Sequence, residues 1–315
     1  MSAHKRPAGA DNEQRSGLGA RLYQQRYLFF FLLPGLIWFI LICYTPMAGI
    51  IIAFKDYSTK LGFLGSPWIG LKYFRQFFHS PWFSTVLVNT IGISLIKLVF
   101  FFPVPIIFAL LLNELPGRKF KRTVQTVSYM PHFISWVVTL AIFGKLLSID
   151  GGLVNQIILR LGGHPINFFS EPGWMWPLAY ITEAWKETGW EAIIYLAALT
   201  SLDPEVGEAA MVDGAGKLKR IVYISLPGIM NTIVVLLIIR IGFMLSANFD
   251  QMYILGRPAT YDTAEVIDTY VYRNNLVNGQ YSLGTAVGLL RSAVNVLLVL
   301  GANKLTKAFA GYGLF

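Results

Sequence analysis

Cysteine, histidine and charged side chains are all scarce in this sequence. The one cysteine, Cys43, lies in an apolar run and cannot form a disulfide within the chain, and a single thiol also excludes a cysteine-based metal site. The few histidines are scattered, and the sequence contains no HExxH, GxSxG or CxxC pattern. No enzyme or metal site is therefore readable, and we expect no cofactor.

Apolar residues, in contrast, are abundant. Hydrophobic residues make up 55% of the 315 positions and charged residues only 14%, with a mean hydropathy of +0.54. A soluble domain of this length would carry more charge. The composition therefore places the chain in a lipid bilayer.

Six apolar segments are long enough to cross the hydrocarbon core, which takes about twenty residues of helix. The fourth of them is the least apolar because it carries four charged residues. We expect prolines to bend the first and third segments, at Pro34, Pro46 and Pro131. The predicted transmembrane helices lie near residues 27–54, 84–112, 123–147, 174–199, 228–255 and 283–303.

Lysine and arginine are distributed unequally over the connecting loops. Fourteen lie before the first span, between the second and third, between the fourth and fifth, and after the sixth, whereas seven lie in the other three loops. The positive-inside rule then makes both termini cytoplasmic. Because this asymmetry explains the net charge of +9, we expect no nucleic acid partner.

These spans give the chain a simple organisation. Residues 1–26 form a cytoplasmic tail, and residues 27–83 the first helix with an extracytoplasmic loop. A transmembrane domain of five helices follows over residues 84–303, with a cytoplasmic loop at 200–227. Residues 304–315 form a second cytoplasmic tail.

The loop between the fourth and fifth spans predicts a short helix. Asp203 and Pro204 suit an N-cap and a first helical position, while Gly214 and Gly216 suit a stop. A helix of about ten residues is marginal alone in water, so it should dock in an apolar groove of a partner. The residues expected to face that groove are Val206, Ala209 and Ala210.

The same loop carries a fixed pattern, EAA-x3-G-x9-I-x-L-P, over residues 208–227. In this it resembles the permease subunits of bacterial ATP-driven importers of the ABC class. LLPGLIWFILICYTPMAGIIIAFKDY at 32–57, SYMPHFISWVV at 128–138, GGLVN at 151–155 and the closing GLF are similar to the branch that imports polysaccharide fragments and oligosaccharides. That resemblance covers nearly the whole chain.

The resemblance implies a type I importer fold, all-helical, in the bacterial plasma (inner) membrane. It implies a second permease, which in this branch is a different chain, a cytoplasmic dimer of nucleotide-binding ATPase subunits and an extracellular sugar-binding lipoprotein. Glu208 would contact the ATPase groove, Ala209 and Ala210 would allow close packing, and Gly214 would supply the turn. The full set of residues expected in coupling is Glu208, Ala209, Ala210, Asp213, Gly214, Ile224, Leu226 and Pro227.

A nucleotide-binding loop is missing from the chain itself. Such a loop needs G-x4-G-K-[ST] to cradle phosphates and hold magnesium. At its nearest approach, Gly216–Lys217, Met211 stands where the first glycine belongs and Leu218 where the hydroxyl belongs. ATP must therefore be hydrolysed by another polypeptide, and this chain is not an enzyme.

Charged groups inside the spans are costly and should face a cavity or a partner. In the fourth span, polar and aromatic residues fall on one face of the helix. Aromatic rings beside carboxylates suit a sugar path, but a structural network of Glu183, Glu187 and Lys186 fits the pattern equally well. The residues of this face are Trp176, Tyr180, Glu183, Lys186, Glu187, Trp190 and Glu191.

The fifth span predicts a second stripe. Asn248, Asp250 and Gln251 at its outer end could contact substrate, or could cap the helix or bond to a neighbouring span. The rest of the stripe is Arg240, Met244 and Ala247. Lys97 and Arg291 are lone cations for which salt bridges or snorkelling are expected, and His132 is expected to form a structural hydrogen bond.

Other readings of the sequence stay open at this point. The substrate of the same transporter class could be something other than a carbohydrate. A membrane-embedded glycosyltransferase would bury acidic groups such as Glu183, Glu187 and Glu191, and a secondary transporter would show internal repeats. Neither of the last two explains the spacing of the EAA pattern, and an exporter would not carry it.

Overall fold

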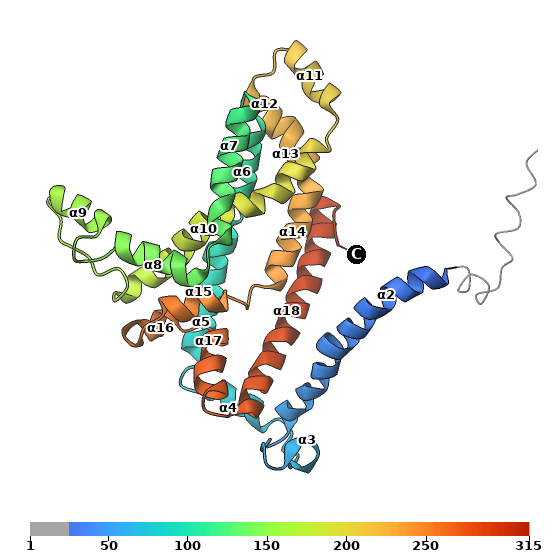
Figure 1. Ribbon diagram of the computed structural model, residues 1–315, viewed down its shortest axis with the longest axis vertical. Helices are drawn as coiled ribbons and strands as arrows, with labels where there is room; N and C mark the ends of the chain where they lie inside the picture. The colour runs from blue at the N-terminus through green and yellow to red at the C-terminus, as the bar shows by residue number, and fades with distance from the viewer. Residues whose placement is uncertain (1–24, 315) are drawn as a thin grey trace, which may run out of the picture.

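The computed structural model describes residues 25–314, apart from the side chains of residues 309 and 310. The predicted N-terminal tail, residues 1–26, therefore lies almost wholly outside the described part. Within it all regular secondary structure is helical, and the one β-bridge, between Lys55 and Trp68, belongs to no strand. Figure 1 shows long helices running between two ends of the molecule, with shorter helices at both ends and along one side.

Three helical runs of the described residues are each long and apolar enough to cross a membrane: Arg26–Phe54, Phe83–Asn113 and Tyr281–Ala308. The first comprises α2 (Arg26–Phe39), η2 (Ile40–Tyr44) and η3 (Thr45–Phe54), and the last lies within α18 (Tyr281–Ala310). The second comprises α5 (Phe83–Ile96), η4 (Lys97–Phe101) and α6 (Pro103–Asn113). They agree with the predicted first, second and sixth spans.

A π-helical turn interrupts the second span at Lys97. Pro103 has no N–H to continue the α-helical ladder, and the backbone N–H of Phe102 bonds to the carbonyl of Lys97 at 3.0 Å, five residues back. The turn is wider than an α-helical one. It lies where the span carries its only charged side chain, facing α10 (Met175–Thr200).

The third predicted span, 123–147, is not one straight helix. Arg118–Phe133, made of α7 (Arg118–Tyr129) and η5 (Met130–Phe133), meets α8 (Trp136–Leu146) at 104°. Pro131 produces the predicted kink by starting a 3-10 turn, after which Ile134 is extended and Ser135 caps α8 through Val138 N at 3.3 Å. The bend is much sharper than a proline kink alone.

The fifth predicted span, 228–255, is wrong at both ends. The helical run begins at α12 (Lys217–Arg220), continues through η7 (Ile221–Ser225) and α13 (Leu226–Gly228), bends by 62° and ends with α14 (Met230–Gly242). Asn248, at φ 61°, then caps a separate helix, α15 (Phe249–Leu255). Apolar composition runs through the break at residues 243–248, so hydropathy did not reveal it.

The fourth predicted span, 174–199, agrees closely with α10, although its charges make it less apolar than a typical transmembrane helix. Three helices of the described residues pass the test of length and composition, or five if each bent pair counts as one span. The predicted number of six crossings thus depends on α10 and on both bent pairs.

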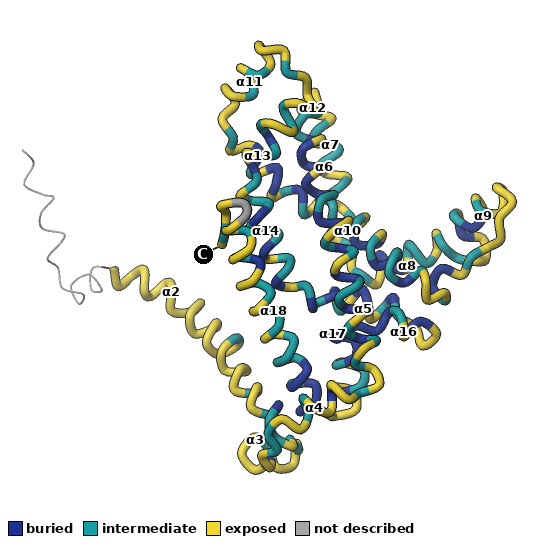
Figure 2. The backbone as a smooth tube through the Cα atoms, turned by 180° about the vertical axis from the view of Figure 1, so that it is seen from behind, coloured by how far each residue is buried: buried dark blue, intermediate teal, exposed yellow. Residues whose placement is uncertain are grey.

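The core of the molecule lies around α10 (Figure 2). Its residues Ala192, Tyr195 and Leu199 pack against α6, in a cluster with Ala109 and Leu112. The opposite side of the molecule is different, because α2 is exposed along nearly its whole length. Such an apolar surface is expected where lipid or another subunit covers the helix.

Short helices complete the two ends. At one end lie α3 (Gly62–Gly65) and α4 (Lys72–Phe78), and at the other lies α11 (Pro204–Val212), as Figure 1 shows. Beside the long helices lie α9 (Leu153–Arg160), η6 (Pro172–Trp174), η8 (Pro258–Thr260), α16 (Tyr261–Ala264), α17 (Ile267–Tyr270) and η9 (Val271–Leu276). The predicted coupling loop, which contains α11, therefore lies at the opposite end of the molecule from the predicted extracytoplasmic loop, which contains α3 and α4.

Candidate functional site

Helix α11 is built as the sequence predicts. The Asp203 carboxylate accepts a hydrogen bond from Glu205 N at 2.9 Å, and Pro204 occupies the first helical position. Gly214 has φ +79°, a conformation that glycine adopts without steric cost, and it ends the helix. The predicted start and stop of this helix are both confirmed.

None of the residues of α11 is buried. Glu208, Ala209 and Asp213 are exposed, Ala210 is half-buried, and the Val212 side chain at the end of the helix is 87% exposed. A helix of nine residues is too short to be stable on its own, and this one buries no apolar face within the chain. It has the properties of a helix that a partner completes.

The segment that follows α11 is attached to the long helices. Arg220, just after it, donates to the Glu114 carboxylate at the end of α6 at 2.5 Å. Leu226 packs against the cluster between α6 and α10, while Ile224 is half-buried and Pro227 exposed. A displacement of α11 would therefore move α6 and α14.

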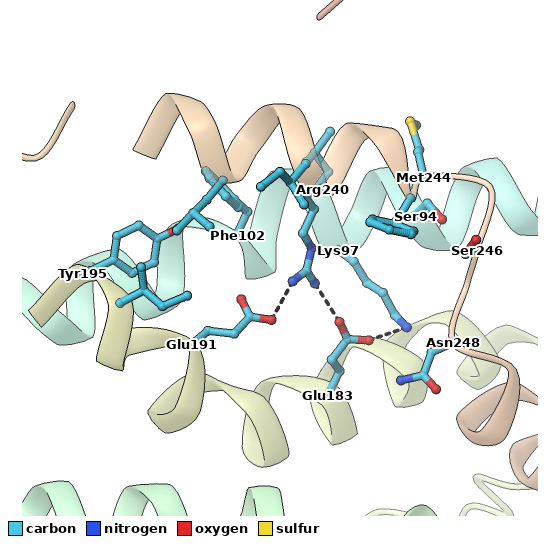
Figure 3. A pocket seen from close by; sticks show the side chains of 15 residues that line it. Ser94, Lys97, Phe102, Glu183, Glu191, Tyr195, Arg240, Met244, Ser246 and Asn248 are labelled. Atoms are coloured by element: carbon cyan, nitrogen blue, oxygen red, sulfur yellow. Dashed lines mark hydrogen bonds and ion pairs between the residues drawn. The ribbon is translucent and has the colours of Figure 1, made fainter. Parts of the chain in front are cut away.

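The second candidate site is a cavity of about 340 Å³ between α5, α10 and α14. Its size is at the lower end of the range of ligand pockets, about 300–1,000 Å³. Figure 3 shows charged side chains in its centre, with Tyr195 and Phe102 towards one end and Asn248 and Ser246 towards the other. The lining residues are Ser94, Lys97, Leu98, Phe102, Glu183, Glu191, Ile194, Tyr195, Leu236, Ile239, Arg240, Phe243, Met244, Ser246 and Asn248.

Four charged groups form a continuous network in this cavity. Arg240 donates from Nη1 to Glu191 Oε1 at 2.6 Å and from Nη2 to Glu183 Oε1 at 2.7 Å. Glu183 also pairs with Lys97, so three helices are joined by ion pairs. Lys97 is thus salt-bridged, as expected, and Arg240 has a structural partner on each side.

Gln251 extends the network on the side of α15. It accepts a hydrogen bond from Lys97 Nζ at 2.7 Å and donates to the carbonyl of Ala179 at 2.7 Å and to Thr182 Oγ1 at 2.8 Å. All its polar atoms are therefore engaged inside the protein, and it lies behind the cavity wall.

The predicted stripe of the fifth span is wrong as one helical face, because α14 ends at Gly242. Arg240, Met244 and Asn248 do line the cavity together, although the turn at residues 243–248 brings them there and not helical periodicity. Ala247 is buried in the core, and Asp250 is exposed and outside the cavity.

A second polar cluster lies on the same face of α10. Glu187 pairs with His132 Nδ1 at 2.6 Å and with Lys186 Nζ at 3.2 Å, and Lys186 also donates to the His132 carbonyl. The His132 ring stacks on Trp190 with 4.1 Å between centroids. These bonds hold the α7–α8 bend against α10, so the structural interpretation applies to Lys186, Glu187 and His132.

Two aromatic candidates are placed elsewhere. Trp176 packs so closely on Gly92 that a Cβ there would come within 2.3 Å of its ring, and its Nε1 donates to the Thr263 carbonyl at 2.9 Å. It therefore joins α10 to α5 and to α16. Tyr180 is half-buried and does not line the cavity.

Several ion pairs could not be read from the sequence. Arg220 with Glu114, Arg240 with Glu183 and Glu191, and Arg291 with Asp268 all join segments distant in the chain. Only the presence of opposite charges at similar depths in different spans could have suggested them. No group of three or more His, Cys, Asp or Glu residues that could hold a metal occurs in the part of the chain that the structure describes.

Comparison with known proteins defines the class to which this architecture belongs. Residues 101–310 match the family described as "Binding-protein-dependent transport system inner membrane component". The match covers α6 to α18, including the whole α11 loop and the cavity. The chain belongs to this family of inner-membrane permeases, which is a transport family and not an enzyme family.

Individual relatives cover almost the entire chain. The polygalacturonan/rhamnogalacturonan transport system permease protein YteP of Bacillus subtilis (strain 168) is 47% identical over 96% of this chain and 94% of its own length. Protein LplB of the same organism is 44% identical over 94% of this chain and 93% of its own length. The likeness predicted from the sequence motifs is therefore confirmed, and the glycosyltransferase alternative is wrong.

Solved structures show the same fold. A chain of a bacterial alginate ABC transporter, crystallised in complex with an alginate pentasaccharide-bound periplasmic protein, is 37% identical with a TM-score of 0.86. The alignment covers 94% of this chain and 99% of that one. The fold is that of a type I ABC permease, all-helical as expected.

Proposed function

We propose that this chain is one permease subunit of a bacterial importer for oligosaccharides or polysaccharide fragments. The relative YteP, 47% identical, is named a permease protein of a polygalacturonan/rhamnogalacturonan transport system. A structural relative belongs to a transporter of the polysaccharide alginate. An extracellular sugar-binding lipoprotein would deliver the substrate, and a second, different permease would supply the other half of the path.

The exposed helix α11 carries the proposal for energy coupling. It is capped at both ends and has no buried residue, although it is short and positioned at the extreme end of the molecule. We propose that α11 docks in a groove of a cytoplasmic ATPase subunit. Glu208 would contact that groove, and Ala209 and Ala210 would allow close approach. Asp213 and Gly214 would form the turn that leaves the groove.

The proposed topology has six membrane crossings with both termini in the cytoplasm of a multi-pass plasma-membrane protein. α10 is counted as a crossing because its charged residues are paired, Glu183 and Glu191 in the cavity and Lys186 with Glu187 outside it, which lowers their cost in the bilayer. The two bent pairs supply the third and fifth crossings. The basic residues of α7 and α12 then lie on the same side as α11, as the positive-inside rule requires.

Transport would follow from alternating access. Closure of the ATPase dimer on ATP would draw the α11 helices of the two permeases together, and the spans would rock outward-open. Arg220–Glu114 and the packing of Leu226 would transmit that movement to α6 and α14. Sugar would then enter from the binding protein, and hydrolysis would restore the inward-open state.

The sugar path is proposed to follow the cavity of Glu183, Glu191, Arg240 and Asn248. Carboxylates and amides accept and donate hydrogen bonds to hydroxyl groups, and Tyr195 and Phe102 supply aromatic surface beside them. Trp190, which is partly exposed on the same face of α10, would extend the path.

Substitutions in α11 test the coupling assignment. Glu208→Lys reverses a charge in the proposed groove, and Gly214→Val places a β-branched residue at φ +79°. Both should abolish uptake and weaken co-purification of the ATPase, while the chain still inserts and binds the second permease. Normal uptake by both variants would contradict the assignment.

The partners and the substrate can be identified together. We expect the tagged chain, extracted gently from its native membrane, to co-purify with an ATPase, a second permease and a sugar-binding lipoprotein. Mass spectrometry of the ligand on the lipoprotein would name the substrate. A non-carbohydrate ligand there would contradict the proposed substrate class.

A further inference from the structure

The contacts of Arg240 are unusual for an arginine between two carboxylates. A guanidinium can form two parallel hydrogen bonds with both oxygens of one carboxylate, which is its strongest arrangement. Here Nη1 contacts one oxygen of Glu191 and Nη2 contacts one oxygen of Glu183. Arg240 therefore makes a single contact with each partner, and Figure 3 shows its guanidinium group between them.

The two carboxylates are held very differently. The Glu183 side chain is 9% exposed and is also paired with Lys97. The Glu191 side chain is 28% exposed, and Arg240 is its one ion-pair partner among the described residues. Glu191 can therefore leave Arg240 and be hydrated in the cavity, whereas the departure of Glu183 would leave the buried Lys97 without its anion.

Arg240 itself would stay in place if Glu191 moved. Its guanidinium lies over the Phe101 ring, 4.8 Å from the centroid, and keeps its bond to Glu183. The Nη1 group then faces the cavity without a partner. Nη1 would then offer a binding position for an oxygen anion. In the absence of a ligand the two cations of the site, Lys97 and Arg240, balance its two carboxylates.

We propose that Arg240 recognises the carboxylate of a uronic acid residue in the substrate, and that this carboxylate replaces Glu191. This inference rests on the proposed function and makes it more specific: the substrate is an acidic oligosaccharide. Glu191 occupies the anion position when no substrate is present. A neutral sugar offers hydroxyl groups only, which replace an ion pair poorly.

The displaced Glu191 also acquires a role. Its carboxylate is then free to accept hydrogen bonds from hydroxyl groups of the same sugar residue. The exchange thus requires both a carboxylate and neighbouring hydroxyl groups on the ligand. Among anions, this would favour a uronate over chloride or a simple organic acid.

Direct binding to the assembled transporter, purified in detergent without its binding protein, tests the inference. The probes are tri-galacturonate and its fully methyl-esterified form, which differ in carboxylate charge and not in the sugar. By isothermal titration calorimetry we expect the wild type to bind the acid at least tenfold more tightly than the ester. Glu191→Gln should increase this preference about tenfold, because no internal anion competes.

The variant Arg240→Gln with Glu191→Gln removes the proposed site without leaving a net charge, since Lys97–Glu183 remains. It should bind both probes equally. The matched control, Arg291→Gln with Asp268→Asn, removes an ion pair away from the cavity and should keep the wild-type preference.

Four results would overturn the inference: no binding of either probe by the wild type, no preference in the wild type, a preference that survives in the Arg240/Glu191 double variant, or weaker acid binding by Glu191→Gln. ATP-driven sugar uptake into proteoliposomes, with the binding protein added, separates this from the proposed function. Uptake without charge preference contradicts the uronate site alone. Absence of any sugar uptake contradicts the importer proposal itself.

Discussion

Gly189 lies where α10 comes very close to α7. A Cβ built on it would lie 2.0 Å from the Ser128 carbonyl oxygen, which is backbone and cannot move aside. Gly189→Ala must therefore separate the two helices, at a cost of about 1–3 kcal/mol for overpacking. We expect a lower melting temperature of the purified transporter in detergent.

Gly144 supplies the control for this substitution. It also lies in a helix, but nothing would be within 4 Å of an added Cβ, so Gly144→Ala should leave the melting temperature unchanged or slightly higher. Equal melting temperatures for the two alanine variants would show that α10 and α7 do not pack this closely.

Glu183 is shared by two cations, Lys97 and Arg240. Glu183→Gln would leave Lys97 buried without its anion and remove one partner of Arg240. Breaking a buried pair on one side costs about 3–5 kcal/mol, which should sharply reduce the amount of folded protein recovered from membranes. Adding Lys97→Gln restores the charge balance and should recover most of the folded protein. An unaltered yield of Glu183→Gln would mean that water reaches this network freely.

At the scale of elements, helix bounds could be predicted where the signals for them lie within the helical segment itself. α11 has its cap, its proline and its terminal glycine within the segment itself, and α10 has its polar face within one uninterrupted helix. Both were predicted within two residues. Glu183 and Glu191, two of the α10 residues that line the cavity, were likewise expected on its polar face, whereas Ile194 and Tyr195 were not.

The bent elements could not be predicted from hydropathy. Ile134 and Ser135 turn α8 by 104°, and the left-handed conformation of Asn248 starts α15, yet the apolar composition continues across both breaks. One continuous membrane helix and two helices joined by a turn then have the same hydropathy profile. Likewise Arg240 and Asn248 meet in the cavity through tertiary packing, which helical periodicity does not encode.

The N-cap of α11 can be tested as an element. Asp203→Ala removes the acceptor of Glu205 N, which costs a helix about 0.5–2 kcal/mol, whereas Asp203→Asn keeps an acceptor. We expect the alanine variant to lower the ATPase stimulation caused by loaded binding protein, and the asparagine variant to retain it. Equal loss in both variants would mean that the charge of Asp203 matters and the cap does not.

For the whole molecule, the exposed surfaces show what an isolated chain leaves uncovered. α2 and α11 bury almost nothing within the described residues. The apolar surface of α2 suits lipid or a second permease, and the more polar surface of α11 suits a water-soluble partner. Their different composition is readable in the sequence. The geometry of the assembly is not, since it depends on surfaces of other chains.

The membrane topology can be tested through the single cysteine. In a Cys43→Ala background, one new cysteine is placed at Leu64, Leu161 or Val212, whose side chains are 96%, 83% and 87% exposed. With six crossings, positions 64 and 161 lie outside and position 212 lies in the cytoplasm, because the bent α7–α8 pair and α10 each cross the membrane once. A membrane-impermeant maleimide should therefore label the first two in intact cells (spheroplasts, if an outer membrane is present) and the third only after permeabilisation. If the α7–α8 pair turns back without crossing, positions 161 and 212 exchange sides, and that labelling pattern would contradict the six-span topology.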